Sequence, residues 1–318
     1  MLEFTVKEND ANMRLDKLLR RLMPTLPDSL MYKYLRTKKI KVNKKRADIS
    51  YKTAAGDVIS CYIPDEFSAA AKPKNYDFLS SPAKLDIVYE DQNIMLINKP
   101  QGLLCHPDKN EYGDTLLFRF QRYLYEKGEY DPQNEQSFKP ALCNRIDRNT
   151  CGMVIAAKNA ESLKIMCDKI KSREIDKRYL TAVHGKPPKA KDTLTSYLFK
   201  DSDKNRVYIQ NRKSDANRTI KTGYEVLAQK NGLSLLEIRL YTGRTHQIRA
   251  QMAALGCPIV GDGKYGRLKF RDINRQCLCS YKLTFEFLSD AGVLSYLNGK
   301  SFEIKDIWFK KELFGGAK

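Results

Sequence analysis

The chain has 318 residues, 42% of them hydrophobic, which is enough for a sizeable core and excludes wholesale disorder. Lysine and arginine outnumber aspartate and glutamate by 57 to 38, giving a net charge of +19. This excess favours a polyanionic partner: nucleic acid is the first candidate, an anionic membrane surface the second, and a charge that serves only solubility the bland alternative.

No apolar run approaches the roughly 20 residues that span a bilayer, and the N-terminus lacks an apolar signal core. We therefore expect a cytoplasmic protein that does not enter the membrane. The chain has eight cysteines, none in a C-x-x-C pair. Their spacing suits neither a zinc site nor a disulfide framework, so we expect reduced thiols and no metal.

Residues 1–63 have the pattern of a small module. "RLDKLLRRLM" carries leucines at helical spacing, and "PDSLMYKYLRTKKI" predicts a second helix with Asp28 or Ser29 as its N-cap. A strand in "IKVN", a turn in "NKKR" and a further strand after Gly56 complete the module.

The second helix and the turn after it form a basic cluster without any acidic residue between positions 33 and 46. Such a cluster can line up against phosphates; the alternative is a solvated helix face. The cluster comprises Lys33, Arg36, Lys38, Lys39, Lys41, Lys44, Lys45 and Arg46.

Residues 64–84 contain three prolines and no lasting periodicity, which predicts a linker. A large domain follows over 85–318. We expect strands in "LDIVYEDQNIMLINKP", a helix in "DTLLFRFQRYLYEKG" that is capped by Asp114 and closed by Gly128, and a strand in "MVIAAK".

The helix expected in "NAESLKIMCDKIKSRE" has an apolar face that includes Met166 and Cys167. "KRYLTAVHG", "TIKTGYEVLAQ" and "LSLLEIRLYTG" predict strands, and "THQIRAQMAALG" predicts a helix ended by Gly256. Strands outnumber helices and do not alternate with them regularly. This pattern favours an α+β fold with a mostly antiparallel mixed sheet over a doubly wound parallel one.

The chain lacks the sequence patterns of phosphate loops and of dinucleotide-binding turns. "GDGKYG" contains only a fragment of such a pattern, and we expect a loop there with Lys264 and Tyr265 exposed. Cys105 and His106 are adjacent, but no nucleophile-elbow pattern surrounds any serine or cysteine. Nucleotide hydrolysis, dinucleotide redox chemistry and serine or cysteine hydrolysis are therefore disfavoured.

"NRIDRNTCG" places Asp147 between Arg145 and Arg148. Taken alone, this stretch is typical of a surface turn with a local ion pair. The alternative is a carboxylate held for chemistry.

Other segments favour the second interpretation. "LYTGRTHQIRAQM" places Arg244, His246 and Arg249 at a strand-to-helix junction, where His246 and Arg249 share a helix face. "KRYLTAVHG" places Tyr179 in an alternating strand, from which a phenol can point into a pocket, and "NKPQGLLCHP" is typical of a loop at a site rim.

Together these segments resemble the RluA family of RNA pseudouridine synthases. "NRIDRNTCGMVIAAK" is similar to the family's His-Arg-Leu-Asp-x-x-Thr-Ser-Gly signature. "NKPQGLLCHP", "KRYLTAVHG" and "GRTHQIRAQMAALGCPIVGDGKYG" match the other blocks in order, so the likeness covers the chain from about Lys84 onward. The module at 1–63 resembles the S-four-type RNA-binding domain, which commonly precedes the catalytic domain in members that act on large-subunit rRNA.

The resemblance implies isomerisation of uridine to pseudouridine without a cofactor. It implies that Asp147 is the nucleophile and that Arg249, or as second choice Arg244, keeps it ionised. Tyr179 would lie against the base and could take the proton from its carbon 5. Arg145 would fill the space left by the flipped uridine or, equally, contact a phosphate.

His246 and Arg244 would contact the substrate. Two further basic segments, 204–218 and 263–275, would help the cluster at 33–46 to hold RNA.

The chain departs from the family pattern beside these positions. Asn144 stands where the signature has His, Cys151 where it has Ser, and Cys279-Ser280 where the family generally shows His-Ala. We expect these changes to affect substrate preference more than activity.

Two other classes of function stay open from the sequence. One is a non-catalytic RNA-binding or ribosome-assembly factor that kept the fold, and the other is a membrane-surface protein, although the helix near 29–40 has only a weak apolar face. A synthase that modifies tRNA instead of rRNA is a variant of the enzyme hypothesis. We expect a monomer.

Overall fold

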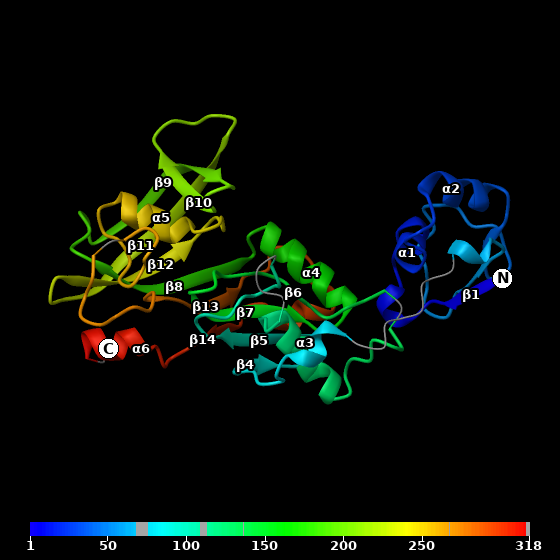
Figure 1. The fold of residues 1–318 in the computed structure, drawn as a ribbon, viewed down its shortest axis with the longest axis horizontal. Coiled ribbons are helices and arrows are strands. Elements are labelled where there is room, and N and C mark those ends of the chain that lie inside the picture. The colour runs from blue at the N-terminus through cyan, green and yellow to red at the C-terminus, as the bar shows by residue number, and fades with distance from the viewer. Residues whose placement is uncertain (68–75, 109–112, 136, 267, 316–318) are drawn as a thin grey trace.

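The computed structural model describes residues 1–67, 76–108, 113–135, 137–266 and 268–315. Figure 1 shows a small N-terminal part beside a much larger body. Each part has its own β-sheet and its own cluster of buried hydrophobic side chains. Within the described ranges, no helix is long and apolar enough to cross a bilayer.

The small part is a three-stranded antiparallel sheet covered by two helices. Its elements are β1 (Leu2–Thr5), η1 (Glu8–Asp10), α1 (Leu15–Leu22), α2 (Asp28–Arg36), β2 (Ile40–Val42), β3 (Val58–Cys61) and η2 (Asp65–Phe67). The leucines that predicted α1 are buried in its core, together with Ile40 and Ile59. The predicted cap of α2 was wrong: the N-cap is Pro27, without a side-chain hydrogen bond.

The first half of the body runs from η3 to β8. Its elements are η3 (Asp77–Ser80), β4 (Ile87–Glu90), β5 (Ile94–Lys99), α3 (Leu116–Glu126), β6 (Ala141–Leu142), β7 (Cys151–Ala157), α4 (Ala160–Lys171) and β8 (Ile175–His184). Phe78, at the end of the segment predicted as a linker, is buried in the core of the body.

The second half of the body supplies most of the long strands. Its elements are β9 (Lys191–Asp201), β10 (Arg206–Gln210), β11 (Asn217–Lys230), β12 (Leu233–Leu240), α5 (Gln247–Ala254), β13 (Leu278–Phe285), η4 (Gly292–Leu297), β14 (Ser301–Glu303) and α6 (Trp308–Phe314).

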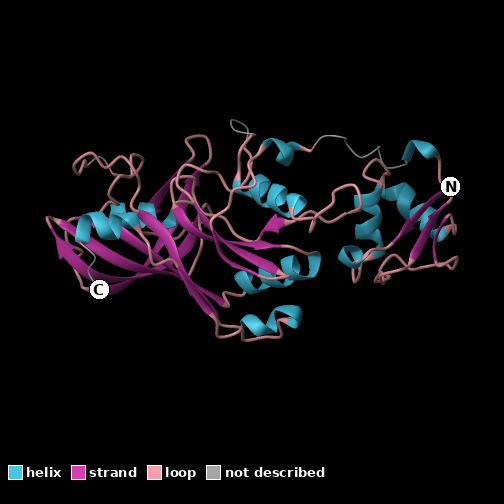
Figure 2. Cartoon of the chain, turned by 90° about the horizontal axis from the view of Figure 1, so that it is seen from below, coloured by secondary structure: helices cyan, strands magenta, loops and turns pink. Residues whose placement is uncertain are grey.

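These strands form an 11-stranded sheet with the path β10-β9-β11-β12-β8-β13-β7-β5-β4, to which β14 and β6 attach at β13 and β7. All pairs are antiparallel except β13 with β7. Figure 2 shows helices on both sides of the strands. The predicted α+β class with a mostly antiparallel mixed sheet is therefore confirmed.

No strand was predicted in the basic segment at 204–218. It contains β10 and the start of β11, and the β9–β10 hairpin rises from one end of the body in Figure 1. In β9, exposed and partly exposed positions alternate, with Leu198 as its fully buried residue. Such a strand gives a weak hydrophobic signal in the sequence.

Two helix predictions need correction. α3 is capped by Thr115, whose hydroxyl accepts the Phe118 N–H at 3.3 Å, whereas the Asp114 carboxylate accepts a hydrogen bond from Arg119 Nε at 2.7 Å. The buried face of α4 contains Met166 and Lys169, but Cys167 is exposed.

Lys169 is buried in α4 because its ammonium binds the Glu174 carboxylate at 2.7 Å. A charge paired in this way can enter a core, and the apolar periodicity of a sequence does not reveal it.

A small polar interface joins the two parts. Asn9 of η1 accepts a hydrogen bond from the Ala160 N–H at the start of α4 (3.1 Å) and donates one to Glu135 (2.9 Å). The side chain of Ser137 hydrogen-bonds to the Asp10 carboxylate beside it. These contacts hold the small part at the N-terminal end of α4.

Candidate active site

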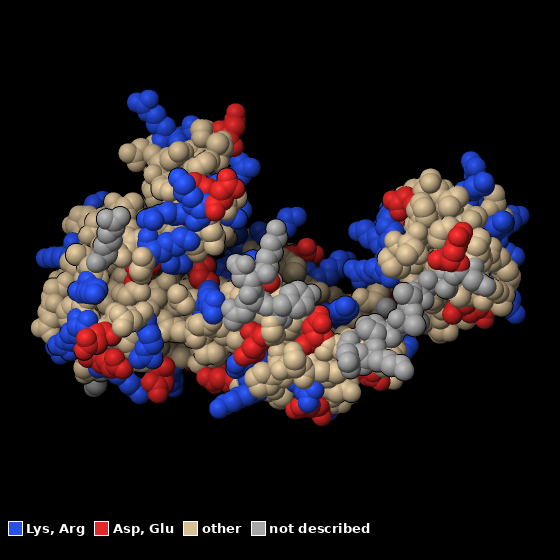
Figure 3. Space-filling view, viewed as in Figure 1, with Lys and Arg blue, Asp and Glu red and all other residues tan. Residues whose placement is uncertain are grey.

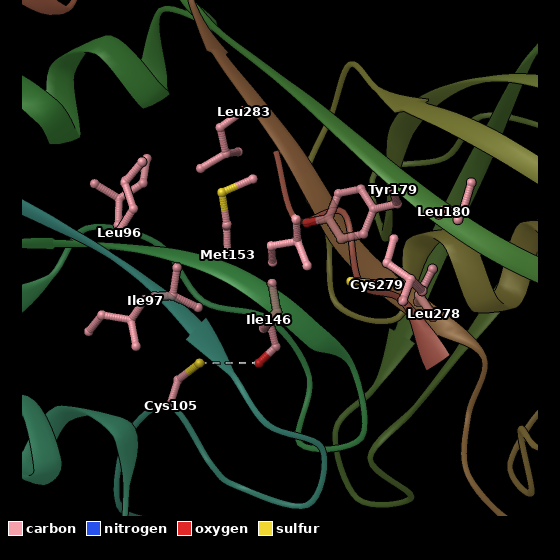
Figure 4. Close-up of a cluster of buried hydrophobic side chains, with 14 of the residues drawn as sticks. Leu96, Ile97, Cys105, Ile146, Met153, Tyr179, Leu180, Leu278, Cys279 and Leu283 are labelled. Carbon is pink, nitrogen blue, oxygen red and sulfur yellow. Dashed lines mark hydrogen bonds between the residues drawn. The ribbon is translucent and has the colours of Figure 1, made fainter. Parts of the chain in front are cut away.

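Asp147 lies in the loop that leads into β7. Its neighbour Ile146 is buried in the main core and accepts a hydrogen bond from the Cys105 thiol through its carbonyl, with sulfur and oxygen 3.4 Å apart (Figure 4). The Asp147 side chain itself is 26% exposed. The loop is therefore anchored in the core while the carboxylate stays accessible.

Lys99, at the end of β5, fixes this loop from the other side. Its fully buried ammonium donates hydrogen bonds to the carbonyls of Pro100 (2.9 Å), Leu103 (2.8 Å) and Arg148 (2.9 Å). Burial lowers the pKa of Lys99 to about 8. One cation thus ties the rim loop in "NKPQGLLCHP" to the residue that follows Asp147.

Gly152 allows β7 to approach β13 closely at the base of the loop. Its φ is +112°, and an added Cβ would lie 2.3 Å from the Ser280 carbonyl oxygen. Only glycine fits this combination of conformation and contact. The close approach places Cys151 opposite Cys279 in the parallel register.

The Arg249 guanidinium joins two carboxylates. Its Nε and Nη2 donate to Asp262 at 2.8 and 2.9 Å, and its Nη1 donates to Asp147 Oδ2 at 3.1 Å. The Asp262 side chain is completely buried and also accepts the N–H groups of Lys264 (3.0 Å) and Tyr265 (3.2 Å). The bidentate pair with Asp262 fixes the plane of the guanidinium and aims Nη1 at Asp147.

His246 is the N-cap of α5 and has a left-handed backbone with φ 52°, so it does not share a helix face with Arg249 as expected. Its Nε2 nevertheless lies 3.8 Å from Asp147 Oδ2. Burial lowers the pKa of His246. This lowering favours the neutral imidazole.

Tyr179 is buried in β8, and burial raises the pKa of its phenol to about 12. Ser280 is its partner in the register between β8 and β13. Tyr179 therefore keeps its proton at neutral pH and presents an aromatic ring to the site.

One cavity of about 320 Å³ collects the candidate residues of the body. Asp147, Tyr179, Arg249, Arg145, Arg244 and His246 all line it. Arg145 and Arg244 are exposed at its edge. Among the described residues, the arginine that pairs with Asp147 is Arg249, and neither Arg145 nor Arg244 forms an ion pair with it.

The basic cluster of the small part lies outside this cavity. Lys33, Arg36, Lys38, Lys39 and Lys44 are exposed, whereas Lys41 is half-buried. In the part of the chain that the structure describes, none of them pairs with an acidic side chain. Figure 3 shows a second concentration of Lys and Arg over the region between α5 and the β9–β10 hairpin.

The positions that depart from the family pattern have structural contacts. The Asn144 side-chain oxygen accepts the Ile155 N–H at 2.8 Å and so supports the start of the loop. Cys279 is buried, and Cys151 partly buried, behind the site. All eight cysteines are free thiols.

Sequence reasoning missed three residues that hold the site in place: Lys99, Asp262 and Tyr265. Lys264 and Tyr265 are half-buried rather than exposed, because the turn at 262–265 packs against α5 and β10. The "GDGKYG" pattern marked this turn, but nothing in the sequence indicated that its aspartate faces Arg249. Within the described residues, no group of three or more His, Cys, Asp or Glu side chains could hold a metal ion.

Comparisons with known proteins agree with this geometry. The family model for RNA pseudouridylate synthase matches residues 93–254. An uncharacterized RNA pseudouridine synthase of Mycoplasma capricolum is 33% identical over 98% of this chain and 100% of its own length. A ribosomal large subunit pseudouridine synthase C of Rickettsia felis is 33% identical over 91% of this chain and 96% of its own.

Solved structures show the same fold. Human RNA pseudouridylate synthase domain containing 4 aligns with a TM-score of 0.55 at 19% identity, over 70% of this chain and 89% of that one. The match to the family over half of the chain, and the identity to full-length relatives, establish that this chain belongs to the RluA family of RNA pseudouridine synthases and is an RNA-modifying isomerase.

Proposed function

We propose that this enzyme isomerises specific uridines in structured RNA, with large-subunit rRNA as its substrate and Asp147 as its nucleophile. The choice of rRNA rests on relatives that are named for the large ribosomal subunit. The choice of Asp147 rests on one observation: an accessible carboxylate held by a fixed guanidinium in a cavity that Tyr179 also lines. The proposal takes the enzyme to act as a cytoplasmic monomer.

The chemistry needs few participants. The bond between ribose carbon 1′ and uracil nitrogen 1 breaks, the base turns, and a bond forms between carbon 1′ and carbon 5. Carbon 5 loses its hydrogen as a proton, and nitrogen 1 gains one. Nothing is oxidised and no outside group is transferred, so the side chains of the cavity suffice without a cofactor.

In this proposal, Asp147 attacks the sugar or the base. In the described chain, Arg249 and His246 both approach its Oδ2. The Oδ1 oxygen is therefore the one left for the substrate. A carboxylate with an accessible oxygen can act as a nucleophile.

Tyr179 acts first as a surface for the base. Because its phenol is protonated in the free enzyme, it can accept the proton of carbon 5 only as its own proton moves to a neighbour.

The target uridine must leave its stack to reach the cavity, which costs a few kcal/mol, roughly, and least in a loop. Arg145 stands exposed at the cavity edge, where its guanidinium can fill the vacated space or contact a phosphate. The exposed cations of the small part, which we propose to be an S-four-type domain, would hold RNA outside the cavity.

Release of tritium from RNA labelled at carbon 5 of uridine tests the proposal, because that hydrogen is lost when carbon 5 joins the sugar. Wild type should release tritium from large-subunit rRNA of a strain lacking this gene, and Asp147→Asn should be slower by about 10³-fold or more. Both should bind the RNA equally. Binding without release by wild type would indicate a non-catalytic factor, and release from tRNA alone would overturn the choice of rRNA.

A further inference from the structure

Tyr265 links the basic hairpin to the candidate active site. Its hydroxyl oxygen accepts the backbone N–H of Val207 in β10 at 2.9 Å. The same hydroxyl lies 2.9 Å from Nδ1 of His246, and the two rings meet edge to face with centroids 5.6 Å apart. The opposite nitrogen of this imidazole, Nε2, is the one that lies 3.8 Å from Asp147 Oδ2.

The hydrogen-bond partners of Tyr265 favour one position for the proton of His246, because among the described contacts Nδ1 is the one acceptor offered to the phenol hydrogen. The Val207 N–H can only donate, so it occupies a lone pair of the Tyr265 oxygen. The phenol hydrogen is then free to donate to Nδ1, provided that Nδ1 carries a lone pair. A neutral imidazole whose Nδ1 accepts must carry its hydrogen on Nε2, because the partner of one ring nitrogen sets the state of the other.

We propose that Tyr265 is a positioning residue that holds His246 in the tautomer protonated at Nε2, so that an N–H donor faces Asp147. The effect of this tautomer on catalysis rests on the proposed function. The assignment of the tautomer rests on the hydrogen bonds of Tyr265 alone.

The other tautomer would destabilise the contact between His246 and Asp147. With the hydrogen on Nδ1, a lone pair on Nε2 would face the Asp147 carboxylate, and the two would repel each other. With the hydrogen on Nε2, the imidazole adds a donor beside the one from Arg249. That donor stabilises the ionised nucleophile and can shift to a polar group of the bound uridine.

Tyr265 is itself firmly held. Two guanidinium groups lie over its ring, those of Arg206 at 5.1 Å and Arg249 at 5.2 Å from the centroid. Its N–H donates to the buried Asp262. Next to it, the Lys264 ammonium hydrogen-bonds to the Asn205 carbonyl in the β9–β10 turn. Removing the hydroxyl alone therefore leaves the ring in place.

The charged groups around His246 fit a neutral ring. Asp147 and Asp262 favour its protonation, whereas Arg249, Lys264 and above all burial oppose it, and the pKa is lowered. The neutral tautomer is therefore the form that Tyr265 selects at the pH of the reaction.

Nitrogen NMR of the imidazoles tests the inference directly. The chain has 3 histidines, so labelling at histidine nitrogen gives few signals, and His246→Ala assigns those of His246. In wild type above about pH 7.5, where the ring is neutral, Nδ1 of His246 should show the shift of an unprotonated nitrogen. In Tyr265→Phe the two tautomers should mix.

Kinetics give the second readout. Tyr265→Phe should lower the single-turnover rate about tenfold, the effect of one positioned hydrogen bond, and leave RNA affinity within about twofold. In the His246→Ala background, the same change should have no further effect. Tyr89→Phe is the matched control, because it also removes one hydroxyl bond, to Asp91 at 2.8 Å, outside the cavity.

Two results would overturn the inference: a protonated Nδ1 in wild type, or equal rate losses for Tyr265→Phe with and without His246. Thermal unfolding of each variant separates these outcomes from misfolding. If the NMR result holds but wild type forms no pseudouridine, the proposed function fails and the tautomer assignment survives.

Discussion

The cavity around Asp147 and the basic cluster at 33–46 both concentrate charge, but they hold it differently. In the cavity, Arg249 makes bonds to two carboxylates and its side chain is 9% exposed. In the cluster, most cations are exposed, and Lys39 lies over the ring of Tyr34, 5.4 Å from its centroid. A buried, paired charge holds its side chain in one orientation, and catalysis needs such fixed groups. An exposed, unpaired cation attracts phosphates from many directions, and this suits binding to an RNA backbone.

The largest effect should come from Asp262, the buried one of the two carboxylates that Arg249 binds, and not from Asp147, the proposed nucleophile. Asp262→Asn leaves Arg249 buried with one weakened partner and should lower the free energy of unfolding by about 3 kcal/mol. Asp147→Asn, at an accessible position, should change it by about 0.5 kcal/mol or less. Urea unfolding measures both, and equal losses would erase the distinction.

Arg249→Met should slow the single-turnover rate by about 10²-fold or more, because Asp147 loses its fixed donor. Arg148→Met is the control: this exposed arginine is adjacent to Asp147 in sequence, and its guanidinium donates to the Gly102 carbonyl instead. It should change the rate less than about threefold. A larger effect from Arg148 would mean that proximity in sequence, not the contact in space, supports the nucleophile.

The basic cluster at 33–46 should increase the salt dependence of RNA binding. If wild type neutralises six phosphates of single-stranded RNA, log K falls with log salt at a slope of about −4. Replacing Lys38, Lys39 and Lys44 with Gln should bring the slope to about −2. The rate at saturating RNA should not change.

A matched triple variant of the C-terminal segment, with Gln at Lys300, Lys305 and Lys310, should keep the wild-type slope. If both triple variants behave alike, the cluster at 33–46 has no special part in RNA binding.

The smallest effect concerns pH. Burial lowers the pKa of His106, His184 and His246 below the usual 6.5. The unfolded chain therefore binds more protons than the folded one as the pH falls through about 6.5, so the free energy of unfolding should decrease from about pH 7.5 to about pH 5.5. Urea unfolding across this range checks the sign, and an increase toward acid would contradict it.

Much of the fold was visible in the sequence. Leucine spacing predicted α1, and short apolar runs predicted β5, β7 and β8. The β9–β10 hairpin was not predicted, because only one residue of each strand, Leu198 in β9 and Val207 in β10, is buried. The predicted apolar face of α4 included Cys167, which is exposed, whereas the structure buries Lys169.

The candidate site was also predicted only in part. The motif blocks identified Asp147, Tyr179 and Arg249, and the structure brings all three to one cavity. Lys99 and Asp262 could not be found from the sequence. Charged residues are expected at the surface unless buried partners are known, and the sequence does not show those partners. The left-handed backbone of His246, whose ring contacts Tyr265 in the turn at 262–265, could not be found in the sequence either.

Mapping of pseudouridines in large-subunit rRNA tests the central claim most directly. RNA would be compared from cells with the gene, without it, and with the Asp147→Asn gene restored in its place. Our account predicts that one or more rRNA sites are pseudouridine only when the wild-type gene is present. Identical maps in all three strains, or restoration of the sites by Asp147→Asn, would contradict it.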